Sequence, residues 1–357
     1  MKKLDSFECI HQRSFLCMVG AFRDLLEFSG HKYSYPFCFG ISSEMGFCYG
    51  HGKKSDDQFS YMASPSYSTQ HALYNMCRVT NVWSETGRVQ EKEKLKRIIK
   101  KYIDENRPVL LEVESTSFFQ ALHIPTFTVN TTSNNSFRIG GHSVLIVGYD
   151  ENNQTYTIIE ALLQKSVKLR MDIVLNSAIV SDCLMAPEGK WSVYYVPPVL
   201  PSEDYMVYQS LIHTVSQMRA KYRDNKEFWY GLEGISKFFE ELVNWPELMP
   251  RDELVRNLTI LYDFERMGHG GGFLRAVYGQ FLDEESKTLK IDELRNVSEL
   301  YFELGTMWSE FAEKIRILIN DPTKESFDRV LSDKELEARI LEKEHRAISE
   351  IERLIHI

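Results

Sequence analysis

Residues 14–30, SFLCMVGAFRDLLEFSG, carry the pattern on which the fold prediction depends. Apolar side chains recur at helical spacing, which predicts an amphipathic helix over 15–29 with Ser14 as a cap and Gly30 as a terminator. Cys17 falls in its first turn, where free backbone N–H groups and the positive end of the helix dipole favour a thiolate. The alternative is a buried apolar cysteine with no chemical role.

Beyond this helix, a charged amphipathic helix is predicted at about 91–104, and β-like runs surround it. The predicted strands are 108–115, 143–150, 155–162 and 190–196. The turn sequence ENNQ joins the second and third of these strands into a hairpin. The first 200 residues are therefore predicted to be mixed α and β.

After PPVLPSED (197–204) the hydrophobic periodicity becomes almost entirely helical. We therefore predict an α+β protein with a domain at 1–200 and a mainly helical domain at 201–357. A long final helix, at about 333–355, carries apolar residues at helical spacing and could pack on a second copy of the chain. The sequence leaves open whether this helix forms a homodimer or docks on its own chain.

The composition excludes several classes of protein. The 357 residues include 42 Lys+Arg and 51 Asp+Glu, a net charge of −9, which argues against a nucleic-acid binder. No signal peptide and no apolar run long enough to span a bilayer are seen, so we expect a cytoplasmic protein. The six cysteines are unevenly spaced and are expected to be free thiols, and no metal site is predicted.

His142 opens the strand in GGHSVLIVGYD (140–150), and Glu160 ends the next strand of the hairpin. A histidine at a strand start lies at the rim of a sheet, where the neighbouring carboxylate can orient its ring. A thiol, a base and an orienting acid are the parts of a nucleophilic triad. A helix-start Cys, a strand-start His and an acid on the adjacent strand follow the chain order of papain-like enzymes.

Seven segments, taken in their order along the chain, carry a resemblance to known proteins. They are CMVGAFRDLLEFSG (17–30), FGISSEMGF (39–47), NRPVLLEVES (106–115), GGHSVLIVGYD (140–150), GLEGISKFFEELVNW (231–245), GHGGGFLRAVYGQFL (268–282) and ELGTMWSEFAEKI (303–315). The N-terminal part resembles the bacteriocin-processing, papain-like peptidases. The whole chain more closely resembles the butirosin biosynthesis protein H family.

This resemblance implies a papain-like acyltransferase domain followed by a helical domain of unknown function. The expected reaction moves an acyl or aminoacyl group from the phosphopantetheine thioester of an acyl carrier protein to a small-molecule amine, in secondary-metabolite biosynthesis. No bound cofactor is implied. Cys17 would be the nucleophile, His142 the general base and Glu160 the orienting acid. The chain departs from many relatives in having Leu16 before the cysteine and Glu rather than Asp as the acid.

Two further sites are weaker expectations. Papain-like enzymes use a Gln about six residues before the cysteine as an oxyanion donor; His11 stands there, with Gln12 beside it, and either could donate. Gly270, Gly271 and Gly272 precede a predicted helix and could hold the phosphate of phosphopantetheine, or could form only a tight turn. A basic run at 92–101 would suit an acidic carrier protein or a lipid headgroup, or is only a solvated face.

Two alternative functions use the same fold. A cysteine hydrolase (peptidase, amidase or thioesterase) would employ the same residues with water as the acceptor. A non-catalytic binding protein would keep the fold without a reactive thiol. The reactivity of Cys17 and the fate of an acyl adduct distinguish these from an acyltransferase.

Overall fold

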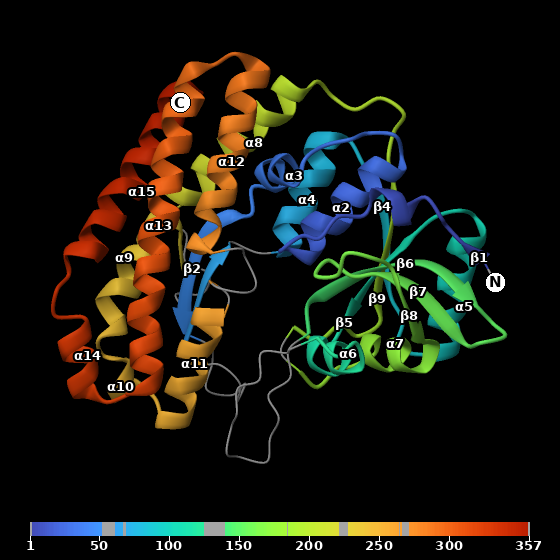
Figure 1. Cartoon of the computed structure of the whole chain (residues 1–357), viewed down its shortest axis with the longest axis horizontal. Helices are drawn as coiled ribbons and strands as arrows, with labels where there is room; N and C mark the ends of the chain where they lie inside the picture. The colour runs from blue at the N-terminus through green and yellow to red at the C-terminus, as the bar shows by residue number, and fades with distance from the viewer. Residues whose placement is uncertain are drawn as a thin grey trace. The chain divides into compact units, whose positions relative to one another are not determined.

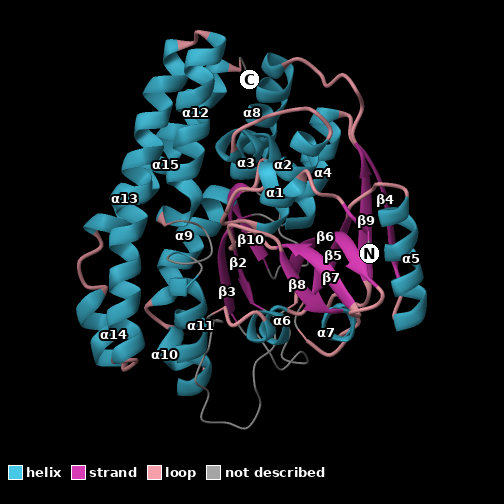
Figure 2. Cartoon of the chain, turned by 45° about the vertical axis from the view of Figure 1, so that its right-hand side comes forward, coloured by secondary structure: helices cyan, strands magenta, loops and turns pink. Residues whose placement is uncertain are grey.

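The computed structural model describes residues 2–51, 61–66, 69–124, 140–183, 185–220, 228–263, 265 and 271–355. The chain forms two compact units. The first comprises Met1–Cys38 and Thr80–Leu200, and the second comprises Phe39–Val79 and Pro201–Ile357. Each unit contains a sheet and helices (Figures 1 and 2). Among the described residues, no helix combines the length and apolar character needed to cross a bilayer.

The first unit is built on a seven-stranded antiparallel sheet. Its order is β4-β9-β5-β6-β7-β8, and β1 also pairs with β6. The strands are β1 (Lys2–Lys3), β4 (Trp83–Arg88), β5 (Val109–Val113), β6 (His142–Asp150), β7 (Thr155–Ile159), β8 (Val167–Arg170) and β9 (Lys190–Tyr195). The predicted hairpin is confirmed, because β6 and β7 pair antiparallel from Asp150 opposite Thr155.

The helices of this unit are α1 (Phe7–Ile10), α2 (Cys17–Phe28), α5 (Lys92–Asp104), α6 (Ser115–Ala121) and α7 (Met171–Ala178), while α3 (Tyr35–Ser42) crosses into the second unit. The predicted helices at 15–29 and 91–104 are confirmed as α2 and α5. Helix α2 packs on β6, and its apolar face is buried.

The start of α2 differs from the expectation that Ser14 caps it. Leu16 is the N-cap, and its side chain makes no capping hydrogen bond. The backbone N–H of Ser14 instead donates to the carbonyl of Ala161, at 2.8 Å. Ser14 therefore belongs to the contact between the N-terminal segment and the residues that follow β7.

The second unit contains a small antiparallel sheet and most of the helices. Its strands, in the order β10-β2-β3, are β10 (Phe228–Tyr230), β2 (Met45–His51) and β3 (Tyr61–Ser66). The helices are α4 (Thr69–Thr80), α8 (Glu203–Arg219), α9 (Gly231–Leu242), α10 (Trp245–Leu248), α11 (Arg251–Asp263), α12 (Arg275–Leu289), α13 (Asp292–Asn320), α14 (Lys324–Val330) and α15 (Glu335–Leu354). In its core, Phe47 stacks on Trp308 and also contacts Phe238.

The predicted α+β class with a mainly helical C-terminal part is confirmed. The division of the chain differs from the predicted continuous domains 1–200 and 201–357, because residues 39–79 group with the helical unit. Tyr230 of β10 pairs with Cys48 of β2, so a strand from before residue 200 completes a sheet with one from after it.

Candidate active site

Cys17 is the first residue of α2 and is half-buried, with a free thiol. A helix leaves the N–H groups of its first turn without intrahelical partners, and the side chain of the N-cap residue Leu16 does not cap them. The positive end of the helix dipole is therefore directed at the sulfur. The N–H of Leu16 donates to the hydroxyl of Tyr35, at 3.1 Å, which fixes the backbone immediately before the cysteine.

The hairpin of β6 and β7 positions the base and the acid. His142 is the first residue of β6, and Glu160 follows the last residue of β7. The Nε2 atom of His142 lies 2.7 Å from Oε2 of Glu160, whose side chain is fully buried. The other carboxylate oxygen of Glu160 accepts a hydrogen bond from the N–H of Leu162, at 3.2 Å. The carboxylate is thereby held against one nitrogen of the ring.

The side chain of Cys17 lies within range of the His142 ring, since its charge contributes to the electrostatics of the imidazole. Since Nε2 is occupied by Glu160, Nδ1 is the nitrogen left for the thiol. Burial disfavours the charged ring, but the negative charges of Glu160 and Cys17 and the hydrogen bonds to both outweigh it and raise the pKa of His142 to about 10. A protonated imidazole beside the sulfur stabilises a nucleophilic thiolate.

Apolar and glycine residues surround the imidazole. The ring of Phe119 in α6 meets the ring of His142 edge-on, with centroids 4.6 Å apart. Before His142, Gly141 has a φ of +73°, a conformation that side chains rarely adopt. The close packing of Phe119 shields one side of the ring from water.

Three predicted residues are thus brought together: Cys17, His142 and Glu160. Sequence reasoning missed Tyr35 and Phe119. Nothing in the pattern around Tyr35 singles it out. Phe119 could have been found, because it follows β5, whose last residue pairs with His142.

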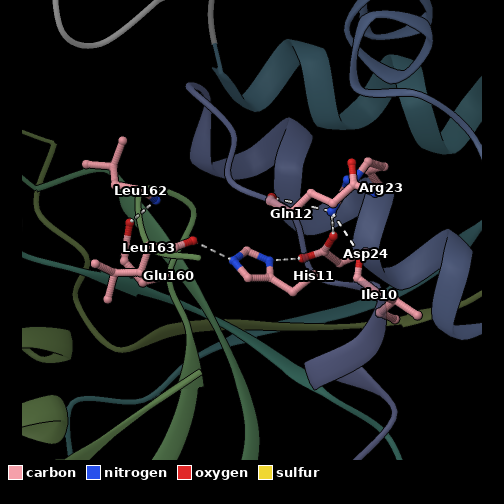
Figure 3. A network of polar contacts seen from close by, with 8 residues as sticks. All are labelled: Ile10, His11, Gln12, Arg23, Asp24, Glu160, Leu162 and Leu163. Atoms are coloured by element: carbon pink, nitrogen blue, oxygen red, sulfur yellow. Dashed lines mark hydrogen bonds and ion pairs between the residues drawn. The ribbon is translucent and has the colours of Figure 1, made fainter. Parts of the chain in front are cut away.

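The expectation that His11 donates to an oxyanion is not supported by the structure. Both nitrogens of its buried ring are engaged: Nδ1 with Asp24, at 2.6 Å, and Nε2 with the carbonyl of Leu163, at 2.9 Å. Figure 3 shows the ring between these partners. The side chain of Gln12 is exposed, and its role as a donor stays a prediction.

The glycine-rich turn already holds an anion from its own chain. The N–H of Gly272 donates to the carboxylate of Glu265 and to the hydroxyl of Ser309. This corrects the predicted phosphate site at Gly272, because the N–H group of Gly272 is occupied, while the role of Gly271 stays a prediction. Gly270 lies outside the described residues. The alternative of a closely packed turn is supported, since a Cβ at Gly272 would lie 2.5 Å from the backbone of α13.

The basic face of α5 is partly paired. Lys100 donates to the hydroxyl of Tyr149 and to Glu151, and Lys96 donates to Gln154. Other basic residues of the helix are exposed: Lys92, Lys94, Arg97 and Lys101. Within the described part of the chain, no group of three or more His, Cys, Asp and Glu side chains is arranged to hold a metal ion.

Two parts of the chain match known domain families. Residues 16–161 match the family described as butirosin biosynthesis protein H, N-terminal, and this match includes Cys17, His142 and Glu160. Residues 175–351 match a domain of unknown function, DUF4872. No curated protein matches the chain. Among solved structures, a C39-like peptidase from Bacillus anthracis is similar, at 13% identity and a TM-score of 0.33, over 54% of this chain and 96% of that one.

Proposed function

Because residues 16–161 belong to the N-terminal domain family of butirosin biosynthesis protein H, and residues 175–351 to a domain family of unknown function, we propose that the protein is a cysteine-dependent acyltransferase of secondary-metabolite biosynthesis. It transfers an acyl or aminoacyl group from a carrier-protein phosphopantetheine thioester to an amine. The observation that carries the proposal is the contact of His142 with both Cys17 and Glu160 inside the matched segment.

In the first half-reaction, the thiolate of Cys17 attacks the carbonyl carbon of the thioester. The new C–S bond forms while the carbonyl oxygen becomes an oxyanion, to which the N–H groups of the first turn of α2, that of Cys17 among them, can donate. Collapse of the intermediate breaks the bond to the pantetheine sulfur, which leaves with the proton of the His142 imidazolium. The products are an acyl-enzyme and the free thiol of the carrier.

In the second half-reaction, the neutral imidazole of His142 accepts a proton from the acceptor amine as its nitrogen attacks the acyl carbon. The C–N bond forms, the bond to Cys17 breaks, and the thiolate and imidazolium pair is restored. A thioester is consumed and an amide is formed, so the transfer is favourable without ATP. Glu160 keeps the ring oriented and stabilises its charge throughout.

The apolar packing of Phe119 against His142 favours an amine over water as the acceptor, because it limits access of solvent to the base. A hydrolase would use the same residues with water. The fate of the acyl-enzyme therefore distinguishes the two reactions.

The test is intact-protein mass spectrometry after incubation with a panel of acyl-pantetheine thioesters. We expect an adduct of acyl mass in the wild type and in Cys9→Ala, a matched control at an exposed cysteine, and none in Cys17→Ala. Amines should discharge the adduct much faster than buffer. Discharge at the same rate in buffer would indicate a hydrolase, and the absence of any Cys17-dependent adduct would contradict the proposal in favour of a binding protein.

A further inference from the structure

The imidazole of His11 is buried in the first unit and joins two segments that are far apart in the sequence (Figure 3). Its Nδ1 atom is bonded to Asp24 and its Nε2 atom to the carbonyl of Leu163, 152 residues away. The side chains of His11 and Asp24 are each 1% exposed. The ring therefore connects the protein with itself and has no nitrogen left for a ligand.

On one side, His11 is attached to the helix that begins with Cys17. Asp24 comes seven residues after Cys17, which is about two turns and nearly the same face of α2. Arg23 pairs with the carboxylate of Asp24 and donates to the carbonyls of Ile10 and Gln12, each at 3.4 Å. The residues on both sides of His11 are thus bonded to α2.

On the other side, His11 holds the end of the segment that begins with Glu160. The N–H of Leu163 donates to the Glu160 carbonyl, at 3.0 Å, and the N–H of Leu162 donates to the Glu160 carboxylate. A second connection between the N-terminal segment and this one is the hydrogen bond from the N–H of Ser14 to the carbonyl of Ala161. The orientation of the Glu160 carboxylate depends on this short segment keeping its shape.

We propose that His11 is a positioning residue, which ties the segment carrying Glu160 to the helix carrying Cys17 and so sets the hydrogen bond between Glu160 and His142. This role rests on the proposed function, since it concerns the same thiol, base and acid. His11 acts through Leu163 and Glu160 and does not touch the reacting atoms.

Both bonds of His11 require a doubly protonated ring. A carbonyl oxygen only accepts, so Nε2 must carry a proton, and the Asp24 carboxylate accepts from a proton on Nδ1. Burial disfavours this charge and Arg23 opposes it, but the hydrogen bond and charge of Asp24, with the bond to Leu163, prevail and raise the pKa of His11. The tie therefore persists to higher pH than an ordinary histidine would allow, and it weakens as the ring loses a proton.

Two amide substitutions separate the two bonds. The amide nitrogen of Gln reaches about as far as Nε2, so His11→Gln can keep the bond to Leu163. The amide nitrogen of Asn reaches about as far as Nδ1, so His11→Asn keeps only the bond to Asp24. We expect acylation of Cys17 by a pantetheine thioester to be at least about tenfold slower in His11→Asn than in His11→Gln.

The second measurement is the NMR titration of the His142 imidazole, which needs no turnover. We expect its pKa to fall in His11→Asn and to change little in His11→Gln. Equal rates and equal titrations in the two variants would overturn the proposal. A wild type that forms no acyl adduct would contradict the proposed function, while the titration would still decide the role of His11.

Should His11→Asn fail to fold, Asp24→Asn keeps an acceptor for Nδ1 and removes the charge that favours the protonated ring. The pKa of His11 then falls, and the tie weakens at a lower pH than in the wild type. The rate of Cys17 acylation is measured against pH. We expect its decline at alkaline pH to begin at a lower pH in Asp24→Asn than in the wild type. A decline at the same pH in both proteins would overturn the proposal.

Discussion

At the scale of the residue, the electrostatics of His142 dominate the site. Its ring is nearly buried, which opposes a charge, yet Glu160 and Cys17 hold the proton on it and raise its pKa to about 10. The ring is then an imidazolium at neutral pH and is ready to protonate a leaving thiol. The carboxylate of Glu160 is therefore expected to matter for charge as well as for geometry.

Glu160→Gln keeps an oxygen that can accept the hydrogen bond of His142 and removes the negative charge. We expect the pKa of His142 to fall toward its ordinary value of 6.5. The imidazolium will then be populated at lower pH only, and alkylation of Cys17 by iodoacetamide at about pH 7 should slow by about tenfold. NMR titration and alkylation rates measure the two effects.

The matched control is Glu112→Gln, which makes the same change on strand β5, where Glu112 pairs with Lys190. This variant should leave the titration of His142 nearly unchanged. If Glu160→Gln also left it unchanged, the charge of Glu160 would not be the cause of the raised pKa.

At the scale of the element, the packing at the start of α2 determines where the thiol lies. The N-terminal segment passes directly over Gly20, and a Cβ at that position would overlap the hydroxyl of Ser14 and lie 2.8 Å from its Cβ. Only glycine permits this approach. The same segment carries His11 and leads into Cys17.

Gly20→Ala must displace the segment at Ser14, and we expect it to lower the free energy of unfolding by about 1–3 kcal/mol. Denaturant unfolding measures this loss. The displacement should also slow alkylation of Cys17, because the backbone before α2 moves with Ser14.

Adding Ser14→Gly to this variant removes the atoms that clash with the new methyl group. We expect the double variant to recover part of the lost stability. A Gly20→Ala protein as stable and as reactive as the wild type would show that the segment adapts without cost.

At the scale of the whole molecule, the two units are not successive along the chain. Residues 39–79 belong to the second unit, where β2 pairs with both β10 and β3. Phe47 and Tyr49 of β2 are fully buried, and Tyr49 stacks on Trp245. These partners all come after residue 200, except for β3.

A chain that ends at Leu200 should therefore expose the apolar side chains of β2 and leave one of its edges unpaired. We expect this fragment to bind the dye ANS and to aggregate, as exposed apolar strands do. Light scattering and dye fluorescence measure both effects. As a control, replacing residues 39–79 of the fragment by a Gly/Ser linker should reduce both aggregation and dye binding. A monomeric 1–200 fragment that binds no dye would contradict the assignment of residues 39–79 to the second unit.

Much of the first unit could be predicted locally. The helix at Cys17, the hairpin and the positions of His142 and Glu160 at its strand ends follow from hydrophobic periodicity and turn residues, which depend on near neighbours. Periodicity also indicates α5. The catalytic roles of Cys17, His142 and Glu160 stay predictions, while their proximity follows from the hairpin and the packing of α2 on β6.

Local patterns in the amino-acid sequence are enough to assign α2, α5, the hairpin and the polar residues at its strand ends, because side chains a few positions apart set those properties. Long-range packing determines what His11 binds, which carboxylate occupies the turn at Gly272, and which sheet residues 39–79 join. Each of these depends on a partner distant in the sequence or on a backbone atom with no sequence signature, such as the carbonyl of Leu163. Hydrogen bonds of this kind form only once packing has brought the segments together.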